Sequence, residues 1–169
     1  MIYLYHGTDE VVGPIDPRRG RRGTDFGQGF YLTPSFDSAK RMALRTARWK
    51  GVQRGVVLRY AVDESERAFA SLKIRSFPCI ALDWLRFVVA NRFRDATADD
   101  HNLDARWDVV RGLVADDRVV QILDDLRQGF ATEDETLKKL QSAPFQTVQY
   151  SFHTLRAVAC LKLQEVTHV

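Results

Sequence analysis

The spacing of apolar residues switches along this chain between the two-residue period of strands and the longer period of helices. Alternation, or short runs of β-branched and aromatic residues, predicts strands at residues 2–5, 30–33, 55–62, 68–74, 108–114, 147–152 and 161–166. Helical spacing predicts helices at residues 36–49, 80–93, 116–128 and 132–142, with a short helical piece at 154–159. Because strands at both ends enclose the helices and no repeat or linker interrupts the pattern, we expect one α+β domain over residues 1–169.

Polar residues and glycines mark the ends of these elements. Ser35 is a typical N-cap for the helix at 36–49, Gly51 is a typical stop, and Thr132 with Glu135 matches a capping box. Residues 9–24 instead mix prolines with glycines, which predicts a long loop. Loops of this length in compact domains are often functional.

Composition fits a globular chain that needs no cross-links. The 169 residues are 45% hydrophobic, which is enough to bury a core without metals or disulfides. The two cysteines, Cys79 and Cys160, show no CxxC pair and no histidine at ligand spacing, so we expect two reduced core thiols and no metal site. Asp83 and Arg86 interrupt the longest apolar run, and no charged leader with an apolar stretch is visible. We therefore expect a soluble, cytoplasmic protein without a membrane partner.

Positive charge is concentrated in one loop. The formal net charge of +3 is too small to demand a nucleic-acid partner, but Arg18, Arg19, Arg21 and Arg22 crowd the glycine-rich segment. Two interpretations stay open. The loop is either a solvated surface segment or a phosphate-binding arm, because arginine offers bidentate donors to phosphate.

Two short motifs carry the candidate chemistry. His6 and Gly7 stand where the first strand should end, and Tyr31 follows the glycines of the segment 25–33, DFGQGFYLT. Alone, a histidine is more often a structural residue than a catalytic one, and Tyr31 could be an ordinary strand residue. The pair is more informative: HGT, then GxGFYLT, then a helix beginning Ser-x-x-Ser-Ala.

This combination resembles the nicotinamide-binding core of the ADP-ribosyltransferases of the poly(ADP-ribose) polymerase and diphtheria-toxin type. The group carries a His-Tyr-Glu triad whose third member varies. The resemblance implies that His6 bonds the ribose next to nicotinamide, that the Gly7 backbone grips the carboxamide, and that Tyr31 packs against the nicotinamide ring. It implies further contacts to NAD from Thr8, Arg18, Arg19, Gly29, Phe30 and Ser38.

A closer resemblance extends over almost the whole chain. A bacterial family of small proteins assigned to the same fold carries the motifs HG[ST], DFGxGFYxT, WLxFVxxNR, DxVxGxVADD and QxxFxT. The corresponding segments here are residues 6–8, 25–33, 84–92, 108–117 and 149–154. The resemblance implies an ADP-ribosyltransferase-like fold of split antiparallel β-sheets with flanking helices. It also implies NAD as a substrate and no metal.

The third triad position departs from glutamate. Near the last strands the candidates are Gln146, Gln149, Gln164 and Glu165, and only Gln149 falls in the QxxFxT context. A glutamine keeps the hydrogen bond to a ribose hydroxyl but cannot act as a base near neutral pH. We therefore expect His6, Tyr31 and Gln149 as the catalytic residues, and single transfer instead of chain elongation.

These observations lead to one expected function and two alternatives. The expectation is an NAD-dependent mono-ADP-ribosyltransferase, the toxin of a bacterial toxin–antitoxin or phage-defence pair, with a protein or nucleic-acid target and a small antitoxin protein as partner. The first alternative is an NAD glycohydrolase that passes ADP-ribose to water. The second is a non-catalytic module that binds NAD or ADP-ribosyl groups, which the glutamine in the triad would suit.

Overall fold

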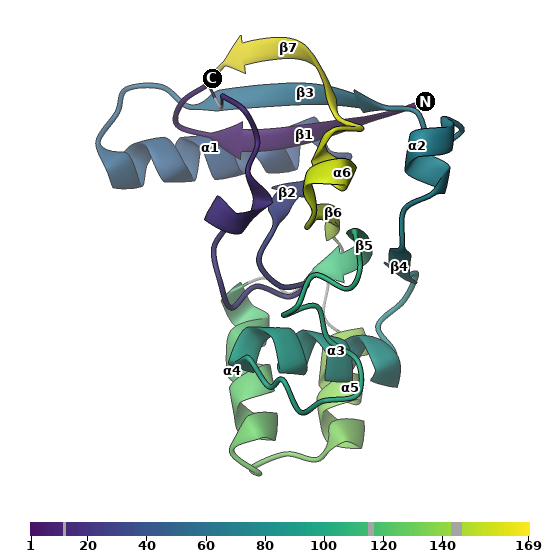
Figure 1. Ribbon diagram of the computed structural model, residues 1–169. Coiled ribbons are helices and arrows are strands. Elements are labelled where there is room, and N and C mark those ends of the chain that lie inside the picture. Colours follow the sequence, from purple (N-terminus) through teal and green to yellow (C-terminus); the bar gives the residue numbers. More distant parts are fainter. Residues whose placement is uncertain (12, 115–116, 143–146) are drawn as a thin grey trace.

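The computed structural model describes residues 1–11, 13–114, 117–142 and 147–169, and it confirms the α+β class. The strands form a three-stranded and a four-stranded sheet (Figure 1). The first holds β1 (Ile2–Thr8), β3 (Val56–Val62) and β7 (Lys162–His168), in the order β1-β3-β7. The second holds β2 (Phe30–Leu32), β6 (Thr147–Phe152), β5 (Val109–Val114) and β4 (Ile74–Phe77), in the order β2-β6-β5-β4.

The sheets are split as expected, but they are not entirely antiparallel. β4 and β5 run parallel, with Ile74 opposite Val109 and Phe77 opposite Gly112. A parallel neighbour needs a crossover connection. The segment between these strands supplies it, because it forms the helix α3 (Leu82–Phe93) and returns the chain to the starting edge.

Helix α1 (Phe36–Lys50) lies along one face of the three-stranded sheet (Figure 1). Ser35 caps it as predicted, its side chain accepting a hydrogen bond from the Ser38 backbone N–H, and Gly51 ends it in the left-handed conformation, with φ of 70°. The buried face consists of Ala39, Ala43 and Ala47. These small side chains let the helix lie close to β1 and β3.

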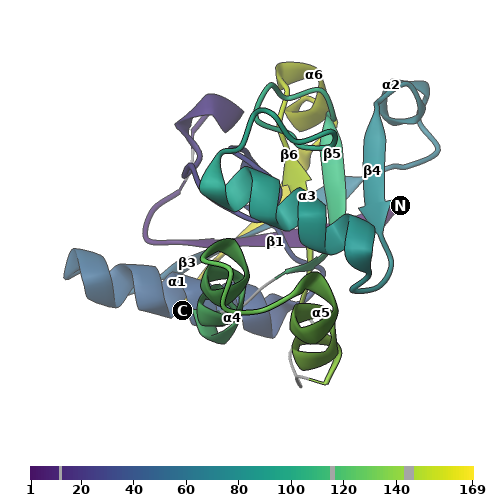
Figure 2. The same ribbon diagram turned by 90° about the horizontal axis from the view of Figure 1, so that it is seen from below.

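Three helices lie at the end of the molecule that holds the four-stranded sheet, and α3 crosses that sheet, as Figure 2 shows from below. They are α3, α4 (Asp117–Arg127) and α5 (Glu133–Gln141), and the capping box of Thr132 and Glu135 opens α5 as predicted. Position 116 of the predicted fourth helix lies outside the described residues. The core here is formed by Phe26, Phe77, Trp84, Leu85, Phe87, Val88, Val110, Val119, Leu123 and Leu140.

Three local predictions were wrong. Of residues 68–74, the first three belong to helix α2 (Arg67–Ala70), 71–73 connect it to β4, and only Ile74 is in a strand. The reason is that Phe69 and Leu72 face the core at a spacing of three, which a strand cannot provide. Cys79 is exposed, in the turn after β4, whereas Cys160 is buried as expected, and both are free. The first strand continues through Thr8, so His6 lies inside it.

Two short helices complete the fold: the 3₁₀ helix η1 (Pro17–Arg19) in the long loop, and α6 (Leu155–Val158) after β6. Within the described ranges, no helix is long and apolar enough to cross a bilayer. The same part of the chain gathers no group of three or more His, Cys, Asp or Glu side chains that could hold a metal ion.

Candidate functional site

The site begins where β1 and β2 separate. Tyr5 and Thr33 exchange two backbone hydrogen bonds, with N–O distances of 2.8 and 2.9 Å. In an antiparallel ladder the backbone groups of every second residue point the same way. The N–H and C=O of Gly7 therefore point toward the β2 side, opposite Tyr31, but among the described residues no backbone bond joins them there.

Pocket A occupies this opening and has a volume of about 320 Å³. It brings together six residues that the sequence singled out, from β1, β2, α1 and β6: His6, Gly7, Thr8, Tyr31, Ser38 and Gln149. Tyr5, Leu32, Thr33, Ala39, Met42 and Thr46 complete its wall. Residues more than a hundred positions apart thus line one cavity of a size that suits a small ligand.

His6 is held in one orientation. Its Nδ1 lies 2.8 Å from the carbonyl oxygen of Tyr31, which can only accept, so Nδ1 carries the proton and donates. Burial lowers the pKa of His6 below 6.5, although the Tyr31 carbonyl acts in the opposite direction. Near neutral pH the ring is therefore uncharged, and Nε2 is left as a hydrogen-bond acceptor. The Phe30 ring supports the imidazole at a centroid distance of 4.4 Å.

Tyr31 has its hydroxyl tied into the preceding loop. The Oη atom donates to the Gly27 carbonyl oxygen at 2.7 Å, accepts from the Phe26 N–H at 3.1 Å, and lies 2.9 Å from Thr24 Oγ1. Burial raises the pKa of this phenol far above neutral pH. Tyr31 therefore offers its ring to the pocket, and its hydroxyl stays protonated near neutral pH.

The loop that holds Tyr31 is anchored to α3. Asp25, buried, forms an ion pair with Arg92, and Gly27 has φ of 90°, where a Cβ would lie only 3.0 Å from the Asn102 carbonyl oxygen. Asn91 accepts from the Asn102 N–H and donates to the Phe87 carbonyl, both at 2.8 Å. Asn91 and Arg92 thus support the site and line neither pocket A nor its neighbour.

Pocket B, of about 530 Å³, lies beside pocket A and shares His6 and Tyr31 with it. Of the residues expected to contact NAD, it contains Arg19, Gly29 and Phe30. Arg18 does not line it; its guanidinium pairs with Asp16, whose carboxylate also caps η1. Arg21 does line it, so the cation beside Arg19 is Arg21 and not Arg18.

Gln149 is the candidate third triad member that the fold brings to the pocket. It lies on β6, opposite Gly112 of β5, and lines pocket A. Gln164 and Glu165 lie on β7 in the other sheet, exposed and away from both pockets. Gln146 lies outside the described residues.

A buried histidine beneath the site escaped the sequence analysis, which assigned no role to His153. Its Nδ1 donates to the Gln28 carbonyl at 2.8 Å, so its Nε2, 2.8 Å from Ser151 Oγ, accepts from that hydroxyl. A Cβ on Gly29 would lie 2.6 Å from Nδ1. His153 therefore fixes the glycine segment before Tyr31. The only signal in the sequence was its place inside the QxxFxT segment.

Acid should destabilise the fold through His153. Burial, against the bond to Gln28, lowers the pKa of this imidazole from 6.5 to about 4. Because the unfolded chain takes up the proton first, the stability that the neutral ring contributes is complete above pH 6.5. It is lost progressively as the pH falls from 6.5 to about 4. The loss amounts to roughly 3 kcal/mol. Urea unfolding between pH 7 and 4.5 measures it, and His153→Gln should flatten this part of the profile; an unchanged profile would contradict the assignment.

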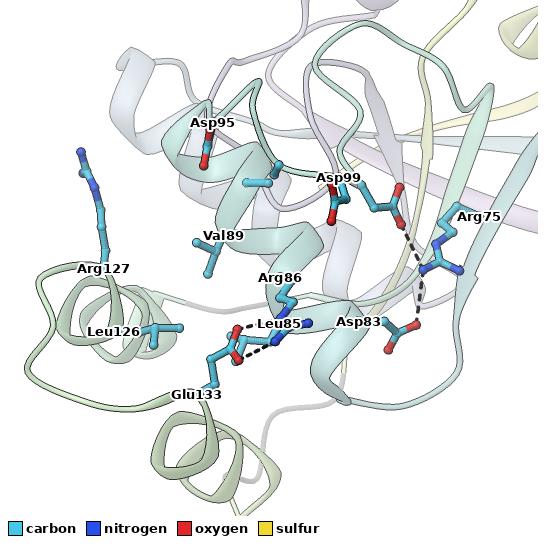
Figure 3. A pocket seen from close by; sticks show the side chains of 13 residues that line it. Arg75, Asp83, Leu85, Arg86, Val89, Asp95, Asp99, Leu126, Arg127 and Glu133 are labelled. Atoms are coloured by element: carbon cyan, nitrogen blue, oxygen red, sulfur yellow. Dashed lines mark hydrogen bonds and ion pairs between the residues drawn. The ribbon is translucent and has the colours of Figure 1, made fainter.

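A larger cavity, pocket C, lies between α3, α4, the start of α5 and the loop at 95–100 (Figure 3), and it shares no lining residue with pockets A and B. Its volume is about 600 Å³. Several of its charged side chains pair with one another: Arg86 binds both oxygens of Glu133 at 2.8 Å, and Arg75 contacts Asp83 and Asp100. Among the described residues, its lining holds no histidine, serine, threonine or cysteine. Pockets A and B are therefore the better candidate site.

Comparison with known proteins bears on the family of the chain. A family model described as "Protein of unknown function (DUF3990)" matches residues 2–163. Neither a curated protein nor a solved structure matches the chain. Because the family model covers nearly all of the 169 residues, this protein belongs to the DUF3990 family.

Proposed function

We propose that this protein is an NAD-dependent mono-ADP-ribosyltransferase with an ADP-ribosyltransferase-like fold. The observation that carries the proposal is the meeting of His6, Tyr31 and Gln149 at one pocket, at the point where two sheets separate. The resemblance in sequence requires such a meeting, and the three residues come from three different strands.

The backbone opening at Gly7 suits a carboxamide. The Gly7 N–H can donate to the amide oxygen of nicotinamide and the Gly7 C=O can accept from its NH₂ group, since both point into pocket A. The ring of Tyr31 forms a flat wall beside this position. Pocket B then receives the rest of the dinucleotide, where Arg19 and Arg21 can neutralise the diphosphate.

In this proposal, His6 and Gln149 form hydrogen bonds to the ribose. The Nε2 atom of His6 accepts a hydrogen bond from a ribose hydroxyl, and the Gln149 amide can bond to a second one. Neither group needs to transfer a proton. The nicotinamide ring is positively charged while it is bonded to the ribose and leaves as a neutral molecule, so correct positioning of the ribose supplies most of the rate acceleration.

The bond changes are simple. The bond between ribose C1′ and the nicotinamide nitrogen breaks, and its electron pair leaves with neutral nicotinamide. An acceptor oxygen or nitrogen then bonds to C1′, and its proton passes to solvent. With Gln149 in place of a glutamate, the site contributes no general base for the acceptor. This favours one transfer per acceptor over chain growth.

A toxin role belongs to the same proposal. An enzyme that modifies a cellular polymer and consumes NAD would harm the cell that makes it, and a small antitoxin protein would neutralise it. The two alternative functions that the sequence left open would use the same pocket A. An NAD glycohydrolase would use water as the acceptor, and a binding module would hold NAD without breaking it.

Labelled NAD distinguishes these functions. The protein is incubated with a bacterial lysate and NAD that carries ³²P in the adenylate phosphate, and the products are digested with nuclease or protease. We expect label on a macromolecule, removed by one of the two enzymes only. Free ADP-ribose with no labelled polymer would instead identify a glycohydrolase. Calorimetric NAD binding without nicotinamide release would identify a binding module. Lys138→Ala, on the exposed surface of α5, serves as the control variant.

A further inference from the structure

The outer surface of α1 is strongly basic. Besides Asp37 the helix has no acidic residue, while Lys40, Arg41, Arg45, Arg48 and Lys50 are all exposed. Of these, Lys50 approaches Asp9 at 3.6 Å. For Arg41 and Arg48, the described residues provide no carboxylate within ion-pair distance. The helix therefore presents positive charge to solvent along its length.

Trp49 stands among these charges and is 84% exposed. The other tryptophans behave differently: Trp84 is fully buried and Trp107 is half-buried. The C-terminal end of α1, where the chain turns back toward β3, projects from the rest of the molecule in both ribbon views (Figures 1 and 2). An indole ring in this place is open to an external ligand from several sides.

The basic surface is connected to the candidate site. Ser38, Met42 and Thr46 line pocket A, and Trp49 follows them on the same flank of the helix, about 16 Å along the axis from Ser38. Arg41 donates to Ser38 Oγ at 2.9 Å, and the Arg45 guanidinium lies 3.3 Å from Met42 Sδ. One continuous path thus leads from the indole ring, past three arginines, to the rim of pocket A.

We propose that the α1 ridge, defined as Arg41, Arg45, Arg48 and Trp49, binds a single-stranded nucleic acid and leads it to pocket A as the acceptor. The arginines contact the phosphates, and a base stacks on Trp49, which is how proteins hold single strands without reading their sequence. The acceptor role rests on the proposed function, whereas the binding itself does not.

The packing of α1 favours this ligand over a lipid surface. A helix that enters a membrane interface needs a free apolar face. The apolar face of α1, Ala39, Ala43 and Ala47, is buried on the three-stranded sheet. The other apolar residues of α1, Phe36, Met42 and Leu44, are only 36–41% exposed and lie on different sides of the helix, so they form no continuous apolar face. The arginines and the 84% exposed Trp49 dominate the outer surface, which matches a phosphate backbone with exposed bases.

Binding is tested without NAD, using fluorescein-labelled 20-nucleotide single strands of mixed sequence, one of RNA and one of DNA. We expect anisotropy to report binding of at least one of them, and Trp49→Ala to weaken it by about 5- to 100-fold. In the double variant Arg41→Gln with Arg48→Gln, the logarithm of the binding constant should fall less steeply with the logarithm of the salt concentration, and the slope should be about 1.4 smaller in magnitude. Lys138→Gln with Lys139→Gln, which removes two exposed charges from α5, is the matched control and should change neither quantity.

The outcomes separate this inference from the proposed function. The inference would be overturned if the wild-type protein and both ridge variants bound the strands with equal affinity. It would also be overturned if the ridge variants lost affinity only for vesicles that contain anionic lipid. Labelled NAD is then added with the tighter strand. The acceptor role is supported if the strand becomes labelled and Trp49→Ala reduces this labelling. In the same variant, the rate of NAD cleavage with water as the acceptor should be unchanged. Strand binding that depends on the ridge, without any NAD cleavage, would instead reject the proposed function alone.

Discussion

Replacing His6 by alanine is expected to reduce NAD-dependent nicotinamide release by about 100- to 1,000-fold, the effect typical of losing one positioned hydrogen-bonding group in an active site. The structural reason is the fixed ring. Nδ1 is committed to the Tyr31 carbonyl at 2.8 Å, and burial lowers the pKa of the imidazole, so Nε2 is a permanent acceptor near neutral pH. Alanine removes that acceptor and the support that links β1 to β2.

His6→Asn separates these two effects. The asparagine amide can still donate to the Tyr31 carbonyl from the position of Nδ1, but nothing replaces Nε2. We therefore expect His6→Asn to unfold at nearly the wild-type temperature and yet to lose as much nicotinamide release as His6→Ala. If His6→Asn kept more than half of the wild-type rate, the assigned role of Nε2 would be wrong. Expression in bacteria gives a second measurement, since folded His6→Ala and Tyr31→Ala proteins should both be non-toxic.

Gly7→Ala is expected to lower the free energy of unfolding by about 2–4 kcal/mol, which is at the upper end for overpacking. A Cβ at this position would lie 1.9 Å from the Ala39 carbonyl oxygen and 2.9 Å from the Ala43 nitrogen. Both are backbone atoms of α1 and cannot move aside. Strand β1 and helix α1 would have to separate, which also widens pocket A.

Gly13→Ala provides the matched control, because a Cβ there meets no atom within 4 Å. Thermal unfolding should show a midpoint lower by about 6–12 °C for Gly7→Ala and little change for Gly13→Ala. A Gly7→Ala protein that is fully stable but inactive would mean that the glycine serves only the ligand. Gly7 also has a structural role, because the residue proposed to bind nicotinamide allows α1 to approach β1 closely.

The local sequence was sufficient for most elements. The apolar period of β3 and β6, the Ser35 cap and Gly51 stop of α1, and the Thr132 capping box all depend on neighbouring residues, so they could be predicted from short segments. The error at residues 68–74 has the opposite origin. Phe69 and Leu72 are apolar residues whose period was ambiguous until the surrounding core selected a helical turn.

The candidate site was predictable only in part. His6 and Tyr31 follow from two paired motifs, and the fold brings both to pocket A. Arg18 was expected to contact NAD, yet it pairs with Asp16, because a loop arginine binds whichever carboxylate its backbone turn places beside it. His153 was missed because its partner Gln28 lies 125 positions away in the sequence, and only the fold brings the two together.

The sequence by itself determined the α+β class, the positions of most helices and strands, and six of the residues that line pocket A. The tertiary structure alone decided that β4 pairs parallel with β5, that the Tyr31 hydroxyl is bonded inside its loop, and that the basic flank of α1 borders pocket A. The physical reason is the distance along the sequence between the residues that make each contact. Caps and periods are set by contacts a few residues apart, whereas pockets, sheet partners and charge environments depend on segments that meet only after the chain has folded.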